Sequence, residues 1–439
     1  MVSLTYGQLI RGNRNFRNLL TGQFISELGN WFNFIAGLGL VRVVSDASPI
    51  AAGIFFVCRL IPFAFASPIA GTFVDRFSRR QVMIWTDIAR FFIALAFLLV
   101  TAADDLWIAY LATALLSVFG AFFDGAKNAA TPNLTKAEGL LAGTALMFST
   151  RFLLMAIGSA LGGWAASVFG YEVAFVINAV SFLVSAYLVW LIPEEATRDA
   201  GTGERMAATE KRASFTRDMR EGINYAFTSH FALTILLINI IWAIGGGAVN
   251  VIFERVGGIH FAEAEAWNPD RAVAILWTAA GLGLTVGMLI AHRTSLMLEI
   301  RNRHSTFIWT TLIIHGILFS IAGFMPTLWL FVVFVFISRA LIGVEYAIQE
   351  TLFQRSLPDY IRGRISTIDR GAELMVFGLS SYVSAALMFY ISPMTLTIVS
   401  GILSASAGLV WYFRHRDDDF RSGAANTSVT AAEKAPEPA

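Results

Sequence analysis

Several charged side chains lie inside long apolar stretches of this sequence, where they could bind a polar molecule or carry a proton. They are Glu27, Arg59, Arg151, Arg339 and Glu345. A charge near the centre of a lipid bilayer costs about 2.5–3.5 kcal/mol on insertion scales, so each of these groups should face protein or water. A binding or coupling site is the first interpretation of such residues, and a structural ion pair is the alternative for each of them.

Two other groups of charges have a spacing that favours local pairing. Asp87 and Arg90 are three residues apart, so on a helix they share one face and can form an ion pair. Asp369, Arg370 and Glu373 cluster in the same way further along the chain. We expect Asp87–Arg90 to be a structural pair, and the second cluster to be structural or to act in a conformational latch.

The composition indicates a membrane protein. The 439 residues are 56% hydrophobic and only 14% charged, whereas a soluble domain has roughly 25% charged residues. The net charge of +1 gives no support for nucleic-acid binding, and we expect none. Cys58 is the only cysteine, so no internal disulfide can form, and we expect neither a metal site nor another cofactor.

Twelve apolar stretches are long enough to cross a bilayer as helices, which takes about 20 residues each. Proline-containing turns divide two longer stretches at Met325-Pro326-Thr327 and Ser392-Pro393. No stretch alternates polar and apolar residues as a barrel strand would. The predicted spans are Phe16–Val41, Ile50–Phe73, Gln81–Thr101, Leu106–Lys127, Leu140–Ser167, Val173–Ile192, Ile223–Phe253, Ala272–Ala291, Ser305–Gly323, Leu328–Gln349, Ile365–Ile391 and Met394–Phe413.

Lysine and arginine collect in alternate loops, which sets the predicted orientation. The basic loops include Arg76, Arg79, Arg80, Lys136, Arg293, Arg301, Arg303, Arg355, Arg362 and Arg364, together with the segment 198–220. The opposite loops hold only Arg42, Arg255 and Arg271, beside several acids. We therefore expect a multi-pass protein of the cell membrane with both termini in the cytoplasm, and interpret Glu254–Arg271 as a solvated, partly helical extracellular cap.

The charged stretch Pro193–Arg220 separates six predicted spans from six, and corresponding loops of the two halves are similar. Thr131-Pro132-Asn133-Leu134, for example, is echoed by Leu357-Pro358-Asp359-Tyr360. This predicts an all-α integral membrane protein with about 12 transmembrane helices in two six-helix pseudo-symmetric bundles. The expected parts are an N-terminal bundle (1–193), a cytoplasmic linker (194–220), a C-terminal bundle (221–413) and a disordered cytoplasmic tail (414–439).

The sequence also resembles the major facilitator superfamily, over nearly the whole chain apart from the tail. The loop Gly71-x-x-x-Asp75-Arg76-x-x-Arg79-Arg80 matches the signature of that family between spans two and three. Finer features resemble the bacterial drug-exporter branch that includes enterobactin and macrolide exporters. They are Asn15-Phe16-Arg17, Gln23-x-x-Ser26-x-x-Gly29, Pro132-Asn133-Leu134 with Leu140-x-Ala142, and Pro358-Asp359-x-x-Arg362-Gly363-Arg364.

The resemblance implies a secondary active transporter that exports a small amphiphilic molecule, such as a drug, siderophore or metabolite, by proton-coupled alternating access. A cavity between the halves would hold the substrate, and Glu27 is the best candidate for the coupling group. Glu27, Asn30 and Asn33 have the spacing of one helical face. The substrate and coupling candidates are Glu27, Asn30, Asn33, Arg59, Arg151, Asn239, Trp242, Arg339, Glu345 and Tyr346.

The resemblance further implies a latch that stabilises one conformation, and a row of small residues for tight helix packing. The latch candidates are Gly71, Asp75, Arg76, Arg79, Arg80 and Asp369; the packing candidates are Gly158, Gly162 and Gly163. The expected partners are a small-molecule substrate and the lipid bilayer. The chain is expected to act as a monomer driven by a proton gradient.

Three other classes of function compete with this one. An enzyme is not expected, because the sequence has no Walker loop, HExxH or GxSxG motif. A lipid or lysolipid transporter or flippase on the same fold would suit the phenylalanine-rich helices equally well. A transport-inactive receptor or assembly partner is the third alternative, and an export assay would separate it from a transporter.

Overall fold

The computed structural model describes residues 4–74, 76–197 and 215–418, and over these ranges the chain is helical and has no β-strand. The first half contains α1 (Tyr6–Gly12), α2 (Arg14–Val44), α3 (Pro49–Val74), α4 (Arg79–Leu95), η1 (Ala96–Leu99), η2 (Ala103–Asp105), α5 (Leu106–Phe169), α6 (Tyr171–Trp190) and α7 (Glu194–Thr197). The second half contains α9 (Phe215–Thr228), α10 (His230–Arg255), η3 (Val256–Phe261), α11 (Ala262–Glu265), α12 (Pro269–Arg301), α13 (His304–Ala322), α14 (Leu328–Ser356), α15 (Asp359–Leu387) and α16 (Pro393–His415).

Ten helical segments within these ranges are long and apolar enough to cross a membrane. Two of them belong to α5, which turns sharply at Lys136, where φ is +54° and ψ is 177°. The long helices α2 and α15 pack against them but are not among these ten. Together they give the twelve long helices that the sequence predicts, and the all-α membrane fold is confirmed.

The turns follow local sequence signals. Thr327 caps α14 and Ser392 caps α16, with Pro393 in the first turn of α16, as expected from the two proline-containing turns. The predicted start of span seven at Ile223 is wrong. Ser229 leaves the helical conformation and its side chain accepts a hydrogen bond from the Ala232 amide, so α9 ends at Thr228 and a new helix begins at His230.

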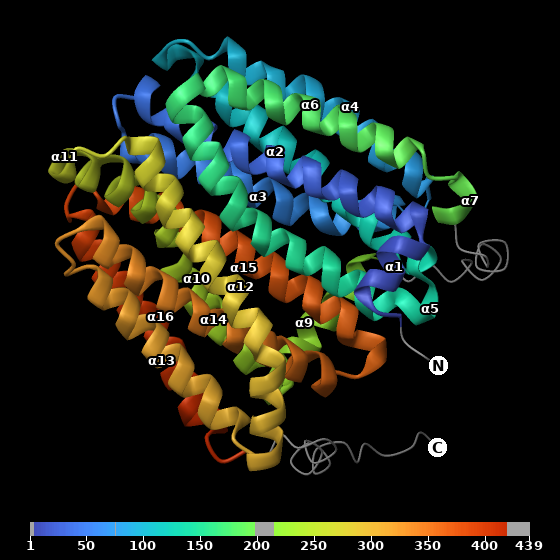
Figure 1. The fold of residues 1–439 in the computed structure, drawn as a ribbon. Helices are drawn as coiled ribbons and strands as arrows, with labels where there is room; N and C mark the ends of the chain where they lie inside the picture. Colours follow the sequence, from blue (N-terminus) through green and yellow to red (C-terminus); the bar gives the residue numbers. More distant parts are fainter. Residues whose placement is uncertain (1–3, 75, 198–214, 419–439) are drawn as a thin grey trace, which may run out of the picture.

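The helices form two bundles that face each other (Figure 1). In the first, α2 packs on α5 and α6, and α3 and α4 pack on α5. In the second, α12 packs on α14, α13 on α14 and α16, and α10 on α15 and α16. The bundles meet along α3–α15 and α5–α12. The exact domain limits stay a prediction, because 198–214 of the linker and 419–439 of the tail lie outside the described residues.

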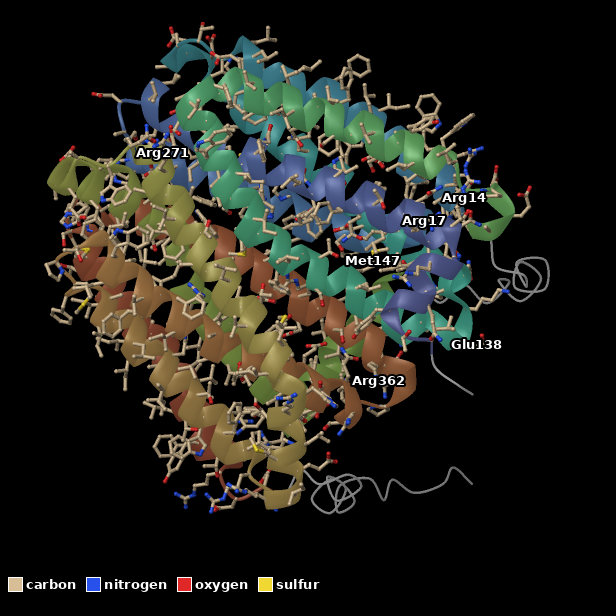
Figure 2. All side chains as sticks on the ribbon, in the orientation of Figure 1. Arg14, Arg17, Glu138, Met147, Arg271 and Arg362 are labelled. Carbon is tan, nitrogen blue, oxygen red and sulfur yellow. The ribbon has the colours of Figure 1, made fainter. Side chains whose placement is uncertain are left out.

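The arginines labelled in Figure 2 lie at two opposite ends of the molecule. Arg14, Arg17 and Arg362 lie at the end that also holds α1, α7 and α9, which we call the basic end. Arg271 and α11 lie at the other end, which we call the opposite end. Long helices connect the two ends, so residues at the middle of these long helices are far from both ends.

Candidate substrate cavity and its closure

A cavity of about 210 Å³ lies mainly within the first bundle, against α15 of the second. Five of the ten predicted substrate and coupling residues line it: Glu27, Asn30, Asn33, Arg59 and Arg151. The other lining residues are Gln23, Ser26, Phe55, Leu60, Phe63, Arg90, Thr113, Leu116, Ser117, Gly120, Phe123, Asp124, Lys127, Arg370 and Leu374. The cavity therefore combines apolar walls with an unusual number of charges for a membrane interior.

A chain of polar contacts runs from Glu27 to the predicted structural pair. Asn30 donates from Nδ2 to Oε2 of Glu27 at 3.2 Å, and its Oδ1 accepts from Nη2 of Arg90 at 3.2 Å. Arg90 in turn forms a buried ion pair with Asp87 at 3.0 Å, which confirms the prediction made from their spacing. Asn30 thus joins α2 to α4 and fixes the direction of the Glu27 side chain.

Two further cations at the cavity have an acid on their own helix. Lys127 pairs with Asp124 at 2.6 Å, and Arg370 pairs with Glu373 at 2.7 Å; both pairs have the three-residue spacing of Asp87 and Arg90. The guanidinium of Arg59 lies over the ring of Phe34, 4.4 Å from its centre, and it is close enough to Glu27 and Arg151 to interact electrostatically with both.

The structure places the polar candidates of the second bundle outside the cavity lining. Asn239 of α10 donates to both carboxylate oxygens of Asp369, at 3.1 and 2.9 Å, and accepts from Gln349 at 2.7 Å. This network joins α10, α14 and α15. Trp242 packs edge-on against Phe377 of α15. Asp369, which we had grouped with the latch, therefore serves packing within its own bundle in this conformation.

Arg339, Glu345 and Tyr346 also stand apart from the cavity lining. The Arg339 guanidinium lies 5.6 Å from the centre of the Phe319 ring, in the contact between α13 and α14. Glu345 is only 1% exposed, and its Oε1 has no hydrogen-bond partner among the described residues. Glu345 is thus a buried acid of the membrane region, separate from the half-buried Glu27.

A buried ion cluster joins the two bundles at the opposite end. Arg42 of α2 binds Glu254 of α10 at 3.2 Å, and also binds Asp270 at the start of α12. Tyr171 of α6 donates from its hydroxyl to Asp270 at 3.1 Å. Arg42, Glu254 and Asp270 are 8%, 1% and 7% exposed. The cluster therefore closes this end by contacts between bundles that exclude water.

This cluster corrects one expectation and adds residues that the sequence did not single out. Glu254 and Asp270 are buried, so the interpretation of Glu254–Arg271 as a solvated cap is wrong for these two positions, although the segment is partly helical as expected. Arg42 had been counted only as a loop charge. The one feature of the sequence that could have indicated a role for Arg42 is its position at the end of an apolar span, in a loop with few other charges.

The arginines of the signature loop contact their own bundle in this conformation. Arg79 donates from Nη1 to the Thr197 carbonyl at 3.2 Å, and Arg80 donates from Nη2 to the carbonyl of Trp190, the last residue of α6, at 2.5 Å. A cation suits a helix C-terminus, where carbonyls are unsatisfied. Arg76 is exposed, and Asp75 lies outside the described residues. A Cβ added at Gly71 would meet nothing within 4 Å.

The packing glycines divide between two contacts. A Cβ at Gly158 would lie 2.6 Å from Cβ of Trp31, and one at Gly162 would lie 3.1 Å from Cα of Phe32, so both glycines let α5 approach α2. A Cβ at Gly163 would overlap Ala274 of α12. Gly163 therefore permits close contact between the two bundles near the ion cluster, as small residues do in membrane helices.

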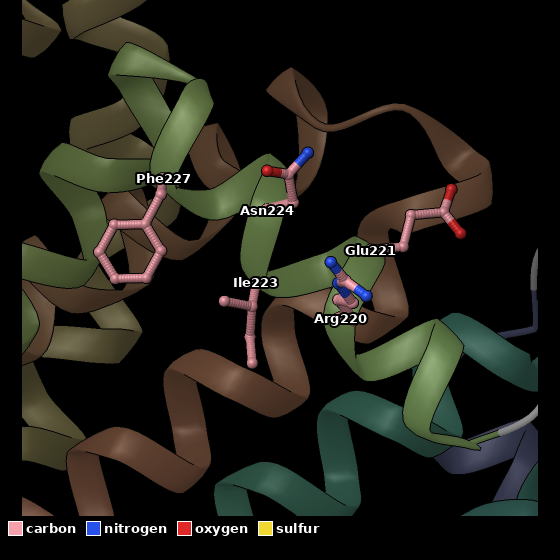
Figure 3. Close-up of a pocket in the computed structure, with 5 residues that line it drawn as sticks. All are labelled: Arg220, Glu221, Ile223, Asn224 and Phe227. Carbon is pink, nitrogen blue, oxygen red and sulfur yellow. The ribbon is translucent and has the colours of Figure 1, made fainter.

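A second hollow lies on the surface of α9 and is separate from the charged cavity. Figure 3 shows its lining residues, Arg220, Glu221, Ile223, Asn224 and Phe227. Glu221 forms an ion pair with Arg364 of α15 at 2.7 Å, which holds α9 against the second bundle. The hollow has few converging polar groups, so the intramembrane cavity is the stronger candidate site.

The comparisons with known proteins agree with this architecture. The sequence profile of the Major Facilitator Superfamily matches residues 19–368. The uncharacterized MFS-type transporter YfiS of Bacillus subtilis (strain 168) is 25% identical over 92% of this chain and 93% of its own length. Macrolide efflux protein A of Enterococcus faecalis is 21% identical over 70% of this chain and 92% of its own. The crystal structure of a mutant of the nucleoside transporter NupG superposes with a TM-score of 0.68 at 15% identity, covering 91% of this chain and 98% of that one.

Proposed function

Because this chain belongs to the major facilitator superfamily, we propose that it is a secondary active transporter that exports a small amphiphilic molecule by proton-coupled alternating access. The family consists of transporters rather than catalysts, and we propose no enzymatic activity. The single observation that carries the proposal is a charged cavity within the membrane region of a molecule whose two bundles are joined at one end by a buried ion cluster.

The proposed orientation places the basic end in the cytoplasm of a cell-membrane protein. Lysine and arginine favour the cytoplasmic side of membrane proteins, and Arg14, Arg17 and Arg362 share the basic end. The Arg42 cluster would then lie on the outside. In this orientation the described conformation would be closed toward the outside, and rupture of the cluster would be needed to release substrate there.

Glu27 is the proposed proton-coupling group. It lines the cavity at mid-helix, and Asn30 connects it to Arg90 and Asp87. A change of charge on Glu27 would alter its attraction to Arg59, with which it interacts electrostatically. Proton transfer would in this way change the charge that the cavity presents to a substrate.

The direction of transport is supported by the relative named for macrolide efflux. The cavity volume of about 210 Å³ favours a smaller substrate than a drug-sized one, whose pockets have about 300–1,000 Å³. The export of a lipid would need a route for acyl chains, and the Asp124, Lys127 and Arg370 side chains at the cavity do not offer one.

The test is pH-gradient-driven flux in proteoliposomes with the purified full chain. Glu27→Gln should abolish coupling to the gradient while the protein still folds, because the amide cannot exchange a proton. Glu345→Gln is the matched comparison, since Glu345 is also an acid within a long apolar helix but is buried and lies outside the cavity lining. Flux that survives in Glu27→Gln and disappears in Glu345→Gln would transfer the coupling role to Glu345.

A further inference from the structure

The charges at the cavity are not balanced. Five basic side chains and two acidic ones line it. Two acids just behind the lining, Asp87 and Glu373, neutralise Arg90 and Arg370, and Asp124 neutralises Lys127. What remains is one acid, Glu27, beside two guanidiniums, those of Arg59 and Arg151.

Arg59 and Arg151 differ from the other three cations in their partners. Among the described residues, neither has a carboxylate within salt-bridge distance, and neither donates a hydrogen bond. Arg59 is half-buried and stacks on Phe34. The Arg151 side chain is exposed although it lies at the middle of the membrane region, because it faces the cavity. Asp124, which interacts electrostatically with Arg151, already binds Lys127.

Both guanidiniums line the same cavity, and Arg151 is close enough to Arg59 to repel it electrostatically. Two like charges that face a common space in a low-dielectric region repel unless an anion lies between them. A planar guanidinium binds a carboxylate or phosphate through paired N–H donors. Asn33 lines the same cavity, and its side-chain amide carries N–H donors of the kind that an oxyanion accepts from.

Resting on the proposed transport function, we propose that the substrate carries an oxyanion group, a carboxylate or phosphate, which binds between Arg59 and Arg151. The rest of the molecule contacts apolar walls that include Phe55, Phe63 and Leu374. The substrate is therefore a small amphiphilic anion. Glu27 competes with it for Arg59, so loss of the Glu27 charge strengthens anion binding.

The experiment measures binding of four probes to the purified full chain in lipid nanodiscs, by titration calorimetry and thermal shift. Phenylacetate, phenylacetamide and phenethylammonium share one apolar body and differ in charge, and phenyl phosphate separates phosphate from carboxylate. Phenylacetate or phenyl phosphate should bind at millimolar concentration and the neutral and cationic probes should not. Whichever of the two anions binds more tightly identifies the preferred group.

Variants locate the binding site. Arg59→Gln and Arg151→Gln should each weaken binding of the anion about ten- to a hundredfold, as expected for loss of one charge-assisted hydrogen-bonding partner. Glu27→Gln should tighten it. Arg271→Gln, which removes an exposed guanidinium at the opposite end, is the control and should leave binding unchanged.

Several results would overturn this assignment. The first is equal binding of phenylacetate, phenylacetamide and phenethylammonium. The second is that neither anion binds at millimolar concentration. The third is unchanged anion binding in the Arg59→Gln/Arg151→Gln double variant. The binding assay does not require translocation. Anion binding without flux would therefore refute the proposed transport function but support the anion site. Flux of a neutral or cationic molecule without anion binding would support transport but refute the anion site.

Discussion

Replacement of Arg42 by glutamine should open the molecule at the opposite end. In the closed conformation, Arg42→Gln leaves Glu254 and Asp270 buried without their cation. Breaking a buried ion pair by removing one partner costs about 3–5 kcal/mol. In an open conformation, water would reach both acids, so nearly all of this cost falls on the closed conformation.

The size of the effect follows from the same figure. At about 1.4 kcal/mol for each factor of ten, the ratio of closed to open molecules should fall about a hundred- to a few-thousandfold. A closed conformation that holds roughly 99% of the molecules would then hold half of them or less. Arg271→Gln is the matched control, because Arg271 is exposed and its guanidinium binds the Ser167 hydroxyl across the bundles, at 2.8 Å. An exposed contact of this kind contributes at most about 1 kcal/mol.

Spin-label distance measurements can report the opening. Asp104→Cys and Glu263→Cys place labels at exposed positions of the short helices η2 and α11, one in each half of the chain, in a Cys58→Ala background that removes the one native thiol. Arg42→Gln should shift the distance distribution to longer values, and adding Glu254→Gln with Asp270→Asn should restore part of the short distance. The reasoning is refuted if the distribution of Arg42→Gln is the same as that of Arg271→Gln in a folded protein.

Three further changes test other parts of the structure. Asp87→Asn should lower the free energy of unfolding by about 3–5 kcal/mol, because it leaves Arg90 buried without its acid. In a thermal unfolding assay, the double variant Asp87→Asn/Arg90→Gln should recover part of this loss. Equal melting temperatures for Asp87→Asn and the unchanged protein would contradict the prediction. Gly163→Ala should cost about 1–3 kcal/mol because the added methyl group overlaps Ala274, whereas Gly71→Ala has free space and should not change the melting temperature of this conformation. If Gly71→Ala nevertheless lowers transport, the glycine is needed in another conformation, as a latch requires; unchanged flux would remove it from the latch. Asn239→Ala should destabilise the second bundle by about 1–3 kcal/mol, because the buried Asp369 carboxylate and the Gln349 amide lose their common partner. A melting temperature equal to that of the unchanged chain would show that this network adds no stability.

The membrane class, the number of spans, the turns at Pro326 and Pro393 and the Asp87–Arg90 pair could all be predicted from the sequence. Each depends on local properties: the apolar length needed to cross a bilayer, the absence of a backbone donor in proline, and side chains three residues apart on one helix. The face shared by Glu27, Asn30 and Asn33 also follows from helical periodicity, and all three residues line the cavity.

The tertiary structure decided which helices' charges meet. Arg42 finds Glu254 and Asp270 more than two hundred positions away, because α2, α10 and α12 converge at one end. Arg59 and Arg151 share a cavity with Glu27, whereas Arg339 faces Phe319 between α13 and α14. Hydropathy fixes how deep a residue lies in the membrane but not the rotation of its helix about its own axis. That rotation is set by contacts between helices, such as those at Gly158 and Gly163, and it alone determines whether a buried charge faces the cavity or a neighbouring helix.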